Sequence, residues 1–357
     1  MTPYGLIEVP RHVYQSSQGG KTYTPLDIKG GLIRQSTPRM GKLVSSKYAE
    51  LDGRQVVSDL LEDRHVSVSF TYVQDLSTAV SNILIDNELS WSYDLPSSLD
   101  LSSIKSVSIS RDGTTLPLQE GSWKMAMCGC FLLNDKEGTA LHSIYVGKSP
   151  ESGNVLFNSL MDKELAHLKE QLPHIDVYQG LADGLAENWT YLTPLTTHQG
   201  LDFYHACLHL DPLSRSIARA DKIGQLTREQ WVEEVKEDWK KKETGVEDRL
   251  KEMKEKVQNI KNDKKKIEAQ AHITYFNNQS SRMKYKQMQD LGLPIGSGKI
   301  EAACKTLVNE RLAQSGMRWT TYGADDVLIV RALKQTNGRW KQTWKKISEK
   351  YRINTSN

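Results

Sequence analysis

Residues 104–218 constrain the fold most, because the period of their apolar residues changes repeatedly along the chain. Apolar–polar alternation and one nearly continuous apolar run predict strands over residues 104–110, 124–133, 140–146, 175–182 and 200–203. Helical spacing predicts helices over residues 154–172, 185–192 and 204–218. Three strands followed by alternating helices and strands fit a mixed sheet flanked by helices. We therefore expect an α/β core.

The N-terminal part has a different composition. Residues 1–54 are rich in glycine, proline, serine and threonine, and we expect a small β or loop module there. Residues 55–92 contain two helical stripes with a tight break between them, a pattern compatible with a helix-turn-helix that reads DNA. Any small helical hairpin gives the same pattern, so both interpretations stay open.

Residues 221–290 are dominated by charge. The first fifty of them carry fourteen Lys/Arg and thirteen Asp/Glu residues. Their apolar residues follow an almost regular heptad spacing of 4, 3, 4, 3 and 7: Val246, Leu250, Met253, Val257, Ile260 and Ile267. We expect a helical insertion with the character of a coiled-coil arm, serving as a solvated spacer or as a dimerising surface.

The charges are segregated along the chain, although the net charge is only +3. Residues 1–50 carry +4, residues 305–357 carry +7, and the stretch between them carries −8. Basic ends around an acidic middle favour a polyanionic partner and a carboxylate-rich centre that holds metal, although solvated surface charge gives the same composition.

Segments that would direct the chain to a membrane or to secretion are not evident in the sequence. The longest apolar run, Met125–Leu133, is far short of the roughly 20 residues that cross a bilayer. The N-terminus lacks the pattern of a signal peptide. The four cysteines show no Cys-x-x-Cys spacing. These features predict a protein of the reducing cytoplasm without structural zinc.

Three carboxylates stand out by their positions. Asp112 and Asp183 each follow a predicted strand and precede a glycine, and Glu301 lies in the first turn of a helix after the glycine-rich segment 292–298. In open sheets, ligands gather where strand ends meet helix starts. Converging carboxylates repel one another unless a divalent cation is present, and oxygen ligands suit Mg²⁺ or Mn²⁺. Taken singly, each residue is also explained by turn chemistry or by the helix dipole.

A second polar cluster follows the last predicted strand. Asp202 and His205 flank the strand end, and His209 lies four residues further along the same helix face. Zinc would need a third ligand, and the sequence offers no convincing one. These residues are therefore structural, or they act beside the carboxylates by orienting them or by contacting a phosphate.

Four segments resemble one family. Residues 292–319, GLPIGSGKIEAACKTLVNERLAQSGMRW, resemble the third-acid signature of bacterial insertion-sequence transposases of the Kra group. These are DDE enzymes related to the Mutator-like transposases. SISRDGTTLPL (108–118) is similar to the first-acid strand of the family, and GLADGLAENW (180–189) to its second. LDFYHACLHL (201–210) matches the Asp-x-x-His motif that follows the second acid.

The resemblance implies an RNase H-like fold whose catalytic core is interrupted by a helical insertion. The core would comprise residues 104–220 and 291–357, the latter including a basic C-terminal tail, with the insertion at 221–290. The implied activity is Mg²⁺-dependent cleavage at transposon ends, followed by strand transfer from the freed 3′-hydroxyl. Relatives often carry Cys-x-x-Cys-Gly where this chain has Ser16–Gly20. Residues 1–54 therefore look like a degenerate zinc ribbon.

The resemblance also implies roles for single residues. Asp112, Asp183 and Glu301 would be the catalytic triad and would hold two Mg²⁺ or Mn²⁺ ions, with Asp202 and His205 as an accessory pair. Contacts with DNA are expected from Lys299, Lys305, Arg311 and Arg318.

The expected partners are the terminal inverted repeats of a transposon and its target DNA. We expect a homodimer or larger assembly on DNA, in the bacterial cytoplasm near the nucleoid. The alternative is a catalytically silent DNA-binding protein derived from a transposase.

Overall fold

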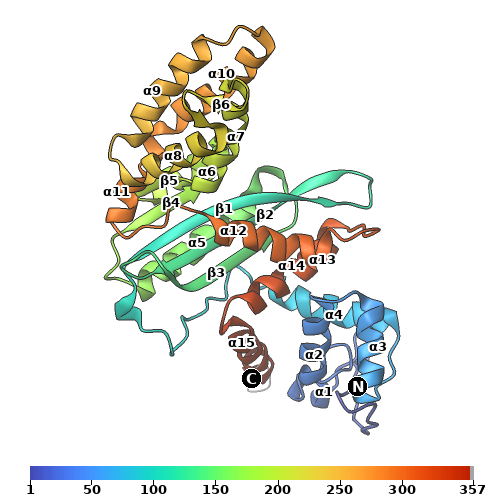
Figure 1. Cartoon of the computed structure of the whole chain (residues 1–357). Coiled ribbons are helices and arrows are strands. Elements are labelled where there is room, and N and C mark those ends of the chain that lie inside the picture. Colours follow the sequence, from blue (N-terminus) through green and yellow to red (C-terminus); the bar gives the residue numbers. More distant parts are fainter. Residues whose placement is uncertain (354–357) are drawn as a thin grey trace.

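A five-stranded mixed sheet forms the centre of the computed structural model, which describes residues 1–353 (Figure 1). Its strands are β1 (Ser106–Pro117), β2 (Trp123–Asn134), β3 (Ala140–Lys148), β4 (Tyr178–Ala182) and β5 (His198–Leu201). They lie in the order β3-β2-β1-β4-β5. The first three strands are antiparallel, and β4 and β5 run parallel to β1. The prediction of an α/β protein with a mixed sheet is confirmed.

Strand β1 is longer than predicted. Asp112 was expected to close the strand at the entrance to a hairpin, but it lies inside β1 and pairs with Cys128 of β2. That expectation was wrong because the long apolar run of β2 pairs with β1 along its whole length. The turn falls between Pro117 and Trp123. The end of this hairpin extends beyond the other strands (Figure 1).

Helices cover both faces of the sheet. The helices α5 (Val155–Gln171), α6 (Ala186–Leu192) and α7 (Phe203–Ile217) share an apolar cluster with one face. On the other face pack α12 (Gly298–Ala303), a π-helical turn (Cys304–Asn309) and α14 (Thr321–Gln335). The short helix α13 (Glu310–Leu312) lies between the last two. Strand β1 contributes side chains to both clusters, since Ile109 belongs to the first and Leu116 to the second.

The N-terminal part is a small helical module. It contains α1 (Pro25–Lys29), α2 (Pro38–Tyr48), α3 (Gly53–Arg64) and α4 (Phe70–Ile85). The expectation of a β or loop module was wrong for α2, because the Thr37 hydroxyl caps the helix and Pro38 occupies its first turn. The predicted pair of helices corresponds to α3 and α4, and DNA reading by them stays a prediction.

The C-terminal helix α15 (Arg339–Ile353) contributes to the core of the N-terminal module. Its Trp344 and Ile347 belong to the same apolar cluster as Val44 of α2 and Leu76 of α4. The last four residues of the predicted basic tail, 354–357, lie outside the described residues.

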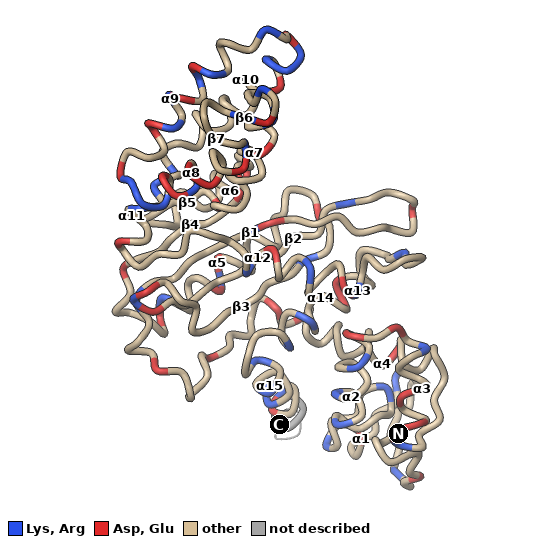
Figure 2. The backbone as a smooth tube through the Cα atoms, viewed as in Figure 1, with Lys and Arg blue, Asp and Glu red and all other residues tan. Residues whose placement is uncertain are grey.

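The insertion between β5 and α12 is helical. It contains a two-stranded ribbon (β6, Lys222–Ile223; β7, Leu226–Thr227) and the helices α8 (Arg228–Lys241), α9 (Gly245–Gln258), α10 (Asp263–Gln279) and α11 (Tyr285–Asp290). Trp231 and Trp239 are buried with α7 in an apolar cluster that continues into the sheet core. The heptad stripe does not continue through α10, because Ile267 is 72% exposed. Positively and negatively charged residues are interspersed along the helices of the insertion (Figure 2).

None of the helices within residues 1–353 is long and apolar enough to cross a membrane.

Candidate active site

Five polar residues named from the sequence lie near one end of the parallel strands. Asp183 directly follows β4, and Asp202 directly follows β5, where it caps α7. His205 lies in the first turn of α7, Glu301 in the first turn of α12, and Asp112 on β1. Because β1, β4 and β5 are parallel neighbours, their carboxyl ends share one edge of the sheet.

Asp202 is the structural centre of this group. Its side chain is fully buried, and its Oδ1 accepts hydrogen bonds from the backbone N–H of His205 at 2.7 Å and from His205 Nδ1 at 3.3 Å. Its Oδ2 accepts a hydrogen bond from the backbone N–H of Ser297. Burial by itself raises the pKa of Asp202, but the hydrogen bonds from His205 and Ser297 outweigh burial and lower it. Asp202 therefore joins α7 to the turn before α12.

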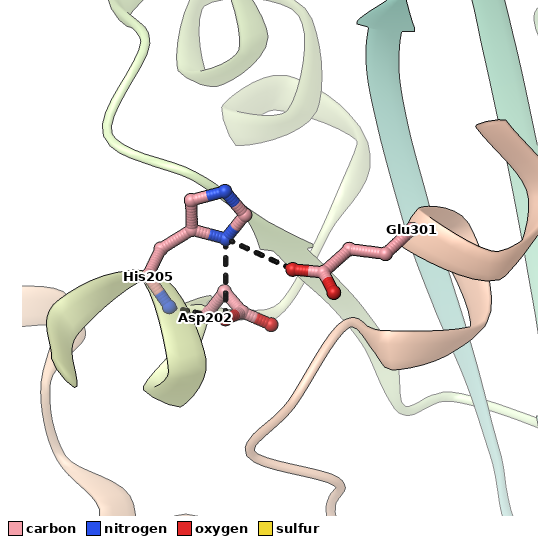
Figure 3. Close-up of side chains that lie close together, drawn as sticks. All are labelled: Asp202, His205 and Glu301. Carbon is pink, nitrogen blue, oxygen red and sulfur yellow. Dashed lines mark hydrogen bonds and ion pairs between the residues drawn. The ribbon is translucent and has the colours of Figure 1, made fainter. Parts of the chain in front are cut away.

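His205 lies between two carboxylates (Figure 3). Its Nδ1 is 3.3 Å from Asp202 Oδ1 and 3.6 Å from Glu301 Oε1. The hydrogen bond to Asp202 raises the pKa of His205, and the charges of Asp202, Asp183 and Glu301 raise it further, against the effect of burial. The imidazole thus bridges α7 and α12, and its charged form is favoured.

Glu301 is partly exposed and faces several charges. Burial raises its pKa, as do the charges of Asp202 and Asp112, while His205 lowers it. The pKa of Asp112 is also raised, first by burial and then by the charge of Asp183. The backbone N–H of Gly113 and the charge of His205 act on Asp112 in the opposite direction. Asp112 is thus the member of the predicted triad that interacts electrostatically with both of the others, with Asp183 and with Glu301.

Asp183 is held by its own loop. Its Oδ1 accepts hydrogen bonds from the backbone N–H of Leu185 at 3.1 Å and from Asn188 Nδ2 at 2.9 Å. The hydrogen bonds described at Asp183 both end on Oδ1, which leaves Oδ2 available. In the same way, the described contact of Glu301 with His205 uses Oε1 and leaves Oε2. Each of these two acids can therefore offer one oxygen to a cation.

The tightest group of metal-ligand atoms differs from the predicted triad. Ligand atoms of Asp202, His205 and Glu301 all lie within 4.8 Å of one another. Asp112 and Asp183 are not members of that group. Asp202 is fully buried and holds three protein N–H groups, whereas Asp112 is partly exposed, so Asp202 is better suited to orient His205 than to bind metal.

The helical insertion reaches this site through α10. A side chain at Gly184 would come within 2.4 Å of the Tyr275 ring, so the loop after β4 fits tightly against that ring. Gln279 Nε2 donates a hydrogen bond to the Gly184 carbonyl at 3.2 Å. His209 stacks on Tyr275 with ring centroids 3.6 Å apart, and its Nδ1 lies 3.0 Å from His272 Nδ1. The insertion therefore supports the loop that carries Asp183.

The four predicted DNA contacts are placed differently. Lys299, Lys305 and Arg318 are exposed. Arg311 is only 2% exposed, and its guanidinium group lies between the rings of Tyr48 and Trp319, with centroid distances of 5.3 and 5.0 Å. Its Nε donates a hydrogen bond to the Tyr48 carbonyl at 3.2 Å. The structure thus gives Arg311 protein partners in place of the predicted DNA contact.

Sequence reasoning did not identify two contacts at the site. Cys304 had no role in the predicted site, yet its Sγ lies 3.8 Å from Asp112 Oδ2. Ser297 was expected only as part of a glycine-rich turn, yet its N–H holds Asp202. The spacing of Glu301 and Cys304, three residues apart on a helix, was the available signal for the first contact.

Comparisons with known proteins give limited information. No family model matches the chain, and no curated protein matches it. Among solved structures, the chain is similar to the Drosophila P element transposase strand transfer complex, with 12% identity and a TM-score of 0.43. The match covers 91% of this chain and 95% of that one. A likeness of this size defines neither fold nor activity, so the function has to be argued from the residues of the site.

Proposed function

We propose that this chain is a DDE-type DNA transposase with an RNase H-like core, which cleaves DNA at transposon ends and transfers the strand. The observation that carries the proposal is the placement of Asp112, Asp183 and Glu301. They come from β1, from the end of β4 and from the first turn of α12, and Asp112 interacts electrostatically with both Asp183 and Glu301. Each acid also lies in the sequence context that resembles the family.

The donor set fits hard divalent cations. Asp183 and Glu301 each keep an oxygen outside the described hydrogen bonds, and carboxylate oxygens are the ligands that Mg²⁺ and Mn²⁺ favour. The charge of Asp183 disfavours the ionised form of Asp112, and a bound cation would relieve that repulsion. Two bound Mg²⁺ ions would supply activation of the attacking hydroxyl and stabilisation of the leaving oxygen.

The remaining residues orient this site. Asp202 fixes the His205 ring and the turn before α12 at the same time, so Glu301 is presented from a restrained helix start. Exposed Lys299 and Lys305 flank Glu301 on the same helical segment, where they can pair with phosphates of a DNA backbone. Because a transposon has two ends, we propose that at least two copies of the chain act together on DNA.

The test is cleavage of labelled DNA that carries the sequences flanking the gene, using the full chain with Mg²⁺. Asp183→Asn should abolish cleavage and leave DNA binding intact, because the amide keeps an oxygen to accept the two hydrogen bonds that hold the loop but loses the charge. Asp176→Asn is the matched control, since Asp176 is exposed and precedes the opposite end of the same strand. Cleavage by the Asp183→Asn variant at the wild-type rate would refute the assignment. DNA binding without cleavage by the wild-type chain would instead favour the catalytically silent DNA-binding protein.

A further inference from the structure

Cys304 makes a contact that the proposed function leaves unused. It lies one helical turn after Glu301 and begins the π-helical turn Cys304–Asn309. Its Sγ is 3.8 Å from Asp112 Oδ2, and the thiol is almost fully buried. A thiol is protonated near neutral pH and is a weak hydrogen-bond donor, so the geometry allows its S–H to donate to the carboxylate.

The two oxygens of Asp112 are therefore restrained from two directions. Oδ1 accepts a hydrogen bond from the backbone N–H of Gly113 at 2.7 Å, on the strand that carries it. Oδ2 faces the thiol of Cys304, which belongs to the helical segment that packs on the sheet. Cys128, which pairs with Asp112 in the β1–β2 ladder, is buried in the same cluster as Cys304. The Cys304 thiol is thus the side-chain partner described for Asp112 Oδ2.

Cys304 also joins two acids that come from distant parts of the chain. Residues three apart on a helix share one face, so Cys304 lies on the same face as Glu301, about one turn further along the helix. Contact of this thiol with Asp112 fixes the side chain on β1 relative to the helix that presents Glu301. A π-helical turn at this point changes the direction of the side chains that follow, and such turns occur frequently at functional sites.

We infer that Cys304 is a positioning residue that holds the Asp112 carboxylate in the orientation needed to share a divalent cation with Glu301. The inference rests on the proposed function, because it assumes that these two carboxylates bind metal. Restraining a ligand before binding lowers the entropy that binding costs. Loss of the thiol should therefore weaken cation binding more than it weakens the fold.

Core packing by itself is the alternative explanation, and Cys130 provides the control for it. Cys130 belongs to the same buried cluster as Cys304 and Cys128, but in the ladder it pairs with Ser110 and not with Asp112. Cys130→Ala and Cys304→Ala remove the same atom from the same core. A difference between them in cation binding is then due to the contact with Asp112.

The experiment measures Mn²⁺ binding to the full chain by electron paramagnetic resonance, with thermal unfolding without metal as the measure of folding. We expect Cys304→Ala to weaken Mn²⁺ binding about two- to tenfold, the range set by one modest hydrogen bond. Cys304→Ser keeps a donor and should stay within about twofold of wild type. Cys130→Ala should bind Mn²⁺ as wild type does, whatever its unfolding temperature.

Several outcomes would overturn the inference. Equal binding by Cys304→Ala and wild type would overturn it, as would an equal loss in Cys130→Ala. Failure of the wild-type chain to bind Mn²⁺ would overturn both this inference and the proposed metal site. Wild-type binding that depends on Cys304, in a chain that cleaves no DNA, would leave the inference standing and overturn the transposase proposal.

Discussion

Replacing Asp202 with alanine tests whether this buried carboxylate holds the site together. The change removes an acceptor that receives hydrogen bonds from the His205 backbone N–H at 2.7 Å, from His205 Nδ1 at 3.3 Å and from Ser297. Hydrogen bonds to a charged group contribute roughly 1.5–3 kcal/mol each, and removing one partner leaves the buried donors unsatisfied. Breaking a buried charged pair in this way costs about 3–5 kcal/mol, and we expect Asp202→Ala to lower the free energy of unfolding by that amount.

The chain contains a matched control for the capping part of this effect. Asp52 caps α3 and accepts hydrogen bonds from the backbone N–H groups of Arg54 at 2.8 Å and Gln55 at 3.1 Å, at a partly exposed position. Asp52→Ala should therefore cost only about 1 kcal/mol, as loss of a helix cap generally does.

The assay is urea unfolding of the wild-type chain and both variants, followed by circular dichroism and by tryptophan fluorescence. Coincident transitions by the two probes permit a comparison of free energies. If Asp202→Ala costs no more than Asp52→Ala, the links from Asp202 to His205 and Ser297 contribute nothing beyond a helix cap, and the reasoning is refuted.

Two further predictions concern residues away from the carboxylates. Arg311→Ala should lower the unfolding temperature by several degrees, because it empties the space between Tyr48 and Trp319. Arg318 is exposed, so Arg318→Ala should leave the unfolding temperature unchanged and weaken DNA binding in a gel-shift assay. The opposite pattern would contradict the placement of both residues. Burial raises the pKa of Asp326 to about 6, so the folded state retains a proton that the unfolded state loses, and stability falls as the pH rises from about 4 to about 6. Asp326→Asn should therefore be more stable than wild type by about 1 kcal/mol near pH 7.5, a value that allows for the partial exposure of the side chain. In thermal melts the variant should lose this extra stability near pH 4. Extra stability that does not depend on pH would count against the raised pKa.

The spacing of apolar residues within each segment was sufficient to predict most strands and helices of the core. The apolar run at 124–133 became β2, and the helix expected at 154–172 became α5, because continuous burial and helical spacing are both properties of neighbouring residues. The error at Asp112 arose because the length of β1 depends on its partner, β2, which follows it in the sequence. The helix over Pro38–Tyr48 was missed although its cap and proline are local signals, since the surrounding composition suggested loops.

The sequence by itself determined which residues the proposed function uses: the order of the acids, the Asp-x-x-His spacing and the segregation of charge are all readable without coordinates. Only the tertiary structure decided how those residues meet. In the folded chain Asp202 is buried and both of its oxygens accept hydrogen bonds, and Arg311 lies between two aromatic rings. Cys304 contacts Asp112, from which it is separated by 192 residues in the sequence. Burial and contact between distant segments depend on how the sheet and helices pack, and no spacing within one segment encodes them.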